Sequence, residues 1–144
     1  MLVESARRRL DGIRIRLGGP DGMTFADALR AAILQSLPLD PARLGEARVW
    51  AAFYARAAVR PDFAAVIADL HKEAFGNLDQ ALRYARLTGE LDLKQDPEAL
   101  ARLILAIIDG LMWAILLDPA AAASNGDAVP QLAALDAALG LITR

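Results

Sequence analysis

The sequence contains no cysteine and only one histidine, His71, among its 144 residues. Without cysteine the chain can form no disulfide bond, no thiolate metal site and no cysteine nucleophile, and this composition suits a reducing compartment. His71 has no histidine or glutamate three or four positions away, so the sequence offers too few ligands for a protein metal site. We therefore expect neither a bound metal nor another cofactor.

A strong charge of either sign is also lacking. Lysine and arginine number 16 against 18 aspartates and glutamates, which gives no electrostatic reason to expect nucleic-acid binding by this chain alone. Residues 1–10 carry Glu4 and three arginines where a secretory signal needs an apolar stretch. The most apolar run, residues 103–117, contains Asp109 and is shorter than the roughly 20 residues that cross a bilayer. We expect a cytoplasmic protein without a membrane contact.

β-Branched and aromatic residues are few, whereas alanine and leucine dominate, and this balance favours helices over strands. The length suits one domain. Start and stop signals predict an all-α fold of about six helices, without strand-like alternation. The predicted helices cover residues 2–17, 24–37, 41–59, 61–88, 97–117 and 127–141.

Capping residues mark several of these helix ends. Thr24, Asp40 and Asp96 are the expected N-caps, and the last two are each followed by a proline at the first helical position. Gly89 is the expected C-terminal cap of the longest helix.

Two predicted helices have little polar surface. The helix at 41–59 combines large apolar residues with seven alanines, which predicts a central place in the fold. The helix at 97–117 has two apolar faces, and its Gly110 and Ala114 are small enough for another helix to approach closely. A small domain can bury one apolar face of a helix more easily than two. The apolar residues of the last predicted helix recur at steps of three and four, as in a coiled-coil seam. We therefore predict a four-helix interface between two copies of the chain, although both faces could instead be internal core. The residues assigned to the dimer interface are Ile104, Ile108, Leu111, Ile115, Leu132, Leu135, Leu139 and Ile142.

The segment from 39 to 117 resembles the C-terminal domain of TetR-family transcriptional regulators, especially the BetI-like subgroup. Residues 43–57 (RLGEARVWAAFYARA) are similar to the central helix of that domain, and residues 60–64 (RPDFA) to the break that follows it. The approach to the first dimerisation helix is matched by residues 89–91 (GEL), 96–103 (DPEALARL) and 108–111 (IDGL). No single motif is diagnostic, but their order and spacing are fairly specific.

The resemblance implies a repressor that binds operator DNA as a homodimer through an N-terminal helix-turn-helix and releases it when a small effector enters the C-terminal domain. Residues 2–17 resemble the helix that connects the two parts, so the DNA-binding part is expected to lie outside this sequence. On this interpretation residues 1–144 are the effector-binding and dimerisation domain, either of a longer regulator or of a stand-alone one.

Aromatic and soft apolar residues at helical spacing are candidates for an effector pocket. They would line a cavity for a mainly apolar ligand or, through their ring faces, for a quaternary ammonium; the simpler alternative is that they are core. The predicted ligand-binding residues are Trp50, Phe53, Tyr54, Ile67, His71, Phe75, Ile107 and Met112. His71 would fix a polar group of the ligand, or else is a boundary histidine with one hydrogen bond.

Asp109 is the one charge inside an apolar helix and therefore needs a partner, either in the pocket or at the interface. The arginines of residues 2–17 are interpreted as a solvated face.

Three other functions remain as alternatives. An enzyme is disfavoured because the sequence has no catalytic residues, since no nucleophile–base pair, phosphate loop or cofactor motif is recognisable. A haem protein would use His71 as its axial ligand. A stand-alone helical dimer would act as a protein-interaction module without any ligand.

Overall fold

The computed structural model describes residues 24–92, 94–118, 120 and 129–143, and this part of the chain is all-α, as predicted. Its helices are α2 (Phe25–Ser36), α3 (Pro41–Ala57), α4 (Pro61–Leu87), α5 (Pro97–Leu116) and α7 (Val129–Ile142). No strand occurs within these described residues. The helix predicted at residues 2–17 lies outside them.

The helix ends follow the predicted capping residues. The side chains of Thr24, Asp40 and Asp96 each accept a hydrogen bond from a backbone N–H in the first turn of their helix. Gly89 follows α4 with a φ of 81°, a conformation that favours glycine, and the next two N–H groups return to the carbonyl of Ala85. These local interactions set where each helix begins and ends.

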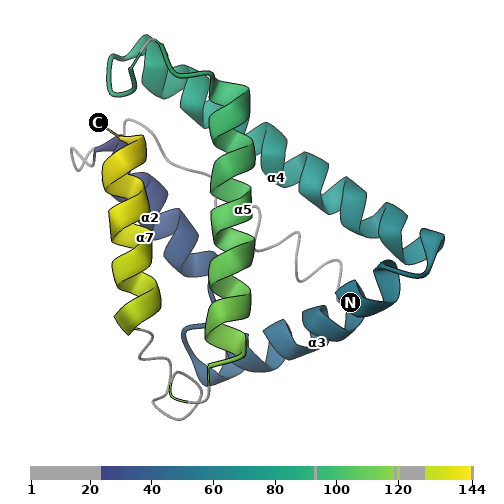
Figure 1. Ribbon diagram of the computed structural model, residues 1–144. Coiled ribbons are helices and arrows are strands. Elements are labelled where there is room, and N and C mark those ends of the chain that lie inside the picture. The colour runs from purple at the N-terminus through teal and green to yellow at the C-terminus, as the bar shows by residue number, and fades with distance from the viewer. Residues whose placement is uncertain (1–23, 93, 119, 121–128, 144) are drawn as a thin grey trace.

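The helices α3, α4 and α5 form the three sides of a triangle, while α2 and α7 lie on the other side of α5 (Figure 1). The helix α5 packs against α3, α4 and α7, so it is shared between the triangle and the rest of the domain. This arrangement divides the apolar interior into two parts.

The larger core lies between α2, the second half of α4, α5 and α7. Its most deeply buried large side chains include Leu29, Leu82, Ile104 and Leu135, one from each of these helices. The smaller core contains Trp50, Ile67 and Leu70, where α3 meets the first half of α4.

The helix α3 is not central, contrary to the prediction from its composition. Only Ala47 and Trp50 are buried on it, because α3 forms an outer side of the triangle. Alanine is apolar but small, so its exposure to solvent costs little free energy. A helix rich in alanine can therefore lie at the edge of the fold.

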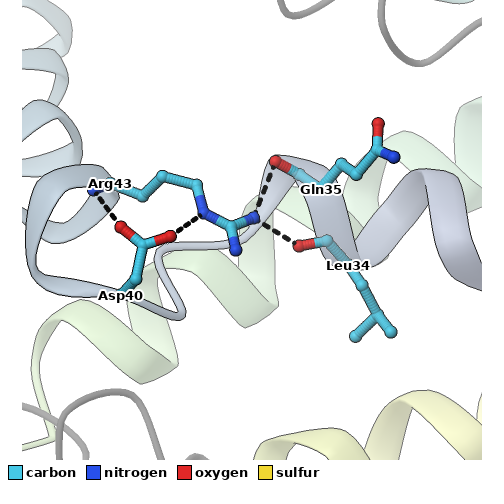
Figure 2. A network of polar contacts seen from close by, with 4 residues as sticks. All are labelled: Leu34, Gln35, Asp40 and Arg43. Atoms are coloured by element: carbon cyan, nitrogen blue, oxygen red, sulfur yellow. Dashed lines mark hydrogen bonds and ion pairs between the residues drawn. The ribbon is translucent and has the colours of Figure 1, made fainter.

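Arg43 joins α3 to the end of α2 (Figure 2). Its Nη1 donates to the carbonyl oxygens of Leu34 and Gln35 at 2.9 and 3.0 Å, and its Nε donates to Asp40. The last carbonyls of a helix lack the usual partner within it, and the guanidinium supplies a charged donor to both; the Leu34 carbonyl also accepts from the backbone N–H of Leu37. Arg43 therefore fixes the corner between the two helices.

The helix α2 is also held by residues distant in sequence. The Glu90 carboxylate, in the connection between α4 and α5, accepts a hydrogen bond from the backbone N–H of Phe25 at 3.1 Å. Arg30 forms an ion pair with Asp136 of α7 at 2.7 Å, and this hydrogen bond lowers the pKa of the Asp136 carboxyl. Thus α2 is tied to the α4–α5 connection, to α3 and to α7.

The helix α5 is the one described helix that is long and apolar enough, by length and composition alone, to cross a membrane. One side of it is buried in the larger core through Leu100, Ile104, Leu111 and Ile115. The opposite side is open along the exposed residues Leu103, Gly110, Trp113 and Leu117, which we call the α5 stripe. Their spacing of seven, three and four residues places them along one face of the helix.

Candidate functional site

Three polar side chains from the three sides of the triangle come close to one another. The Tyr54 hydroxyl of α3 lies 2.9 Å from Nε2 of His71 on α4. Asp109 of α5 interacts electrostatically with both residues. Tyr54 and Asp109 are half-buried and His71 is exposed, so the group extends from the interior to the surface.

Burial determines the ionisation of two members of this group. Desolvation raises the pKa of Asp109, and the charge of His71 opposes that rise. Burial, helped by the negative charge of Asp109, raises the pKa of Tyr54 to about 12. The Tyr54 hydroxyl therefore stays protonated, and its oxygen lies within hydrogen-bonding distance of Nε2 of His71. Asp109 makes no hydrogen bond or ion pair with any described residue.

Aromatic rings lie behind this group on α3 and at the start of α4. The ring of Trp50 lies 5.6 Å from that of Phe53, and Phe53 lies 4.9 Å from Phe63, both edge-to-face. Tyr54 is also packed against Trp50 at 6.1 Å. Because these rings contact one another, they form a packed wall rather than an open cage.

A groove of about 480 Å³ runs between α4 and α5 beside the polar group. This volume falls within the range of small-molecule sites. The guanidinium of Arg102, which belongs to α5, lies 4.8 Å from the centre of the Phe75 ring on α4. The residues that line the groove are His71, Lys72, Phe75, Arg102, Leu105, Ala106 and Asp109.

The predicted ligand-binding residues separate into three groups. His71 and Phe75 line the groove, and Tyr54 lies behind it through its hydrogen bond to His71. Trp50, Phe53 and Ile67 belong to the smaller core. Ile107 packs against the larger core, and Met112 is half-buried on the same helix.

The sequence did not single out Lys72, Arg102, Leu105 or Ala106 as site residues. A signal for them was present in the spacing of 102, 105, 106 and 109, which is one face of α5. Choosing that face required knowledge of how α4 and α5 pack against each other, which brings it opposite residues 71–75.

The residues predicted for a dimer interface lie mostly inside the single chain. Ile108 and Leu132 are half-buried, and the other six are at most 8% exposed. These six are Ile104, Leu111, Ile115, Leu135, Leu139 and Ile142. The exposed apolar residues of the same helices are different ones, chiefly the α5 stripe and Leu141 of α7.

The described residues hold no cluster of three or more histidine, aspartate or glutamate side chains that could bind a metal ion.

Solved structures with this arrangement of helices are transcriptional regulators. A transcriptional regulator from Rhodococcus sp. Rha1 is 32% identical, with a TM-score of 0.69 over 98% of this chain and 78% of that one. A TetR-family regulator from Rhodococcus sp. is 18% identical, with a TM-score of 0.77 over 99% of this chain and 70% of that one. GusR of Salmonella enterica is 22% identical, with a TM-score of 0.73 over 99% and 69% of the two chains. The fold is thus that of a regulatory domain of transcriptional regulators.

The family follows from the sequence itself. The model of the BetI-type transcriptional repressor C-terminal domain matches residues 25–140, which is most of the chain. The chain therefore belongs to the TetR family of transcriptional regulators and carries its BetI-type C-terminal domain, which confirms the resemblance seen from residues 39–117. A comparison with curated proteins gives no match.

Proposed function

We propose that this chain is the effector-binding and dimerisation domain of a TetR-family repressor, and that it senses a small, mainly apolar molecule in the groove between α4 and α5. The observation that carries the proposal is the meeting of Tyr54, His71 and Asp109, one from each side of the triangle, beside that groove. A ligand that bonds to this group contacts helices that are otherwise joined mainly at their ends.

A ligand at this place would favour one arrangement of the triangle over another, because its free energy of binding depends on how α3, α4 and α5 are placed. Operator DNA would then be contacted by a helix-turn-helix domain joined to this one, in the cytoplasm. The chain itself would carry out no reaction.

Nile red, an uncharged apolar dye, tests whether the groove binds a ligand. The Ala106→Phe variant should weaken dye binding, measured by fluorescence, because Ala106 lines the groove. Ala114→Phe is the matched control, since Ala114 is exposed on the same helix and does not line the groove. Equal dye affinity in the two variants would contradict an effector site in the groove.

We also propose that two copies of the chain associate through the α5 stripe and the exposed side of α7. The stripe presents Leu103, Trp113 and Leu117 to solvent, and Leu141 of α7 is 74% exposed. Gly110 has open space where a side chain would begin, so a second helix can approach α5 closely there. Exposed apolar residues gathered in this way are typical of an interface between proteins.

A further inference from the structure

We propose that the groove between α4 and α5 selects an amphiphilic organic anion: a carboxylate held by Lys72 and Arg102, an apolar body, and a hydrogen-bonding group that reaches Asp109. This inference rests on the proposed effector site and adds the chemical class of its ligand.

The charged residues of the groove favour an anion. Lys72 of α4 and Arg102 of α5 supply two cations from opposite walls, against Asp109 as the one carboxylate of the lining. Lys72 has no hydrogen-bonding or ion-pair partner among the described residues. Arg102 gives one nitrogen, Nη2, to Glu98 at 3.3 Å and keeps its other N–H groups for a ligand.

The groove also has apolar lining residues, namely Phe75, Leu105 and Ala106. Leu105 and Ala106 stand between Arg102 and Asp109 along α5, and Phe75 and Leu105 are half-buried. Arg102 and Asp109 are seven residues apart on α5, which corresponds to about 10 Å along a helix. A carboxylate near Arg102 and a hydroxyl near Asp109 therefore require a ligand about as long as a hydroxylated aromatic acid.

A quaternary ammonium ligand fits the same residues less well. The face of Phe75 is already covered by the guanidinium of Arg102, so a cationic ligand would have to displace it. Trp50 and Phe53 pack edge-to-face in the smaller core and do not line the groove. A cationic ligand would also face two positive side chains of the groove lining, Lys72 and Arg102, and only one carboxylate, Asp109.

Calorimetric titration of the full chain with three probes tests the inference. The probes are 4-hydroxycinnamate, its uncharged amide, and phenyltrimethylammonium. The acid should bind about tenfold more tightly than the amide, because a charge-assisted hydrogen bond contributes at least that factor. Lys72→Gln and Arg102→Gln should each weaken binding of the acid about five- to tenfold and leave binding of the amide unchanged.

Arg48→Gln is the matched control, because Arg48 is exposed on α3 and does not line the groove. It removes the same charge and should leave the affinity for the acid unchanged. Lys72 and Arg102 are also exposed, so thermal unfolding should show both variants to be folded.

The outcomes separate the ligand class from the effector site itself. If the amide or phenyltrimethylammonium binds as tightly as the acid, or if Lys72→Gln and Arg102→Gln behave like Arg48→Gln, the anion inference is overturned and the effector site stands. If none of the three probes binds but Nile red does, the anion inference is overturned and the effector site stands. If Nile red is also not bound, the inference and the effector site fall together.

Discussion

At the scale of single residues, the polar group depends on side chains that three different helices bring together. The Tyr54 hydroxyl lies 2.9 Å from Nε2 of His71, and Asp109 interacts electrostatically with both. Their meeting depends on the angles at which α3 and α5 cross α4, which no local sequence pattern contains.

Asp109→Asn should raise the melting temperature at pH 7.5. Burial raises the pKa of Asp109, so its ionised form is less favourable in the folded chain than in the unfolded chain. That cost is present above the folded pKa and disappears as the pH falls to the ordinary value of about 3.9. The difference in melting temperature between the variant and the parent should therefore shrink to nothing by about pH 4, as measured by circular dichroism. A variant less stable than the parent at pH 7.5 would contradict this account.

Tyr54→Phe should lower the free energy of unfolding by about 1 kcal/mol, the typical contribution of one hydrogen bond, because it removes the bond between the Tyr54 hydroxyl and His71. Tyr84→Phe serves as the control: Tyr84 is 47% exposed and its hydroxyl has no described partner, so its removal should have no effect. Urea unfolding measures both. Equal losses in the two variants would mean that the bond between Tyr54 and His71 contributes nothing to stability.

At the scale of helices, the sequence predicted most of the ends and missed the connections between them. Caps depend on residues within one turn, so Thr24, Asp40 and Asp96 could be recognised directly. Arg43 and Glu90 act across sequence gaps, on the carbonyls of α2 and on the N–H of Phe25. Nothing in the local sequence distinguishes these two residues from exposed charges.

Arg43→Gln should lower the free energy of unfolding by about 1–2 kcal/mol, because two carbonyls at the end of α2 lose a charged donor. Arg48→Gln, five residues along on the same helix and exposed, should change it little. Urea unfolding of the two variants provides the comparison. If they lose the same amount, the bonds that Arg43 makes to α2 do not stabilise the corner.

At the scale of the whole molecule, the sequence correctly suggested that α5 has two apolar faces and did not reveal which one is internal. Both faces have large aliphatic residues at helical spacing, so periodicity gives them equal weight. The structure buries the face of Ile104 and leaves Leu103 and Trp113 exposed. The choice is decided by where α2, α4 and α7 pack, which is a property of the complete fold.

Trp113→Glu should shift the chain from dimer to monomer, because a carboxylate in the centre of the α5 stripe would be buried without a partner when two copies meet. Val59→Glu adds the same charge to an apolar residue that is 79% exposed beyond α3, and it should leave the oligomeric state unchanged. Sedimentation velocity distinguishes the two species. A dimer in both variants, or a monomeric parent, would contradict association through the stripe.

The attachments of α2 have a mechanical consequence. One end of α2 is held by Glu90, in the connection between α4 and α5, and the other end by Arg43 of α3. The helix α2 therefore links two parts of the triangle, α3 and the connection between α4 and α5. Any change that alters the separation between α3 and that connection must tilt α2, move it along its axis, or break one attachment. Because α2 is also paired with α7 through Arg30 and Asp136, a displacement of α2 would act on α7 as well.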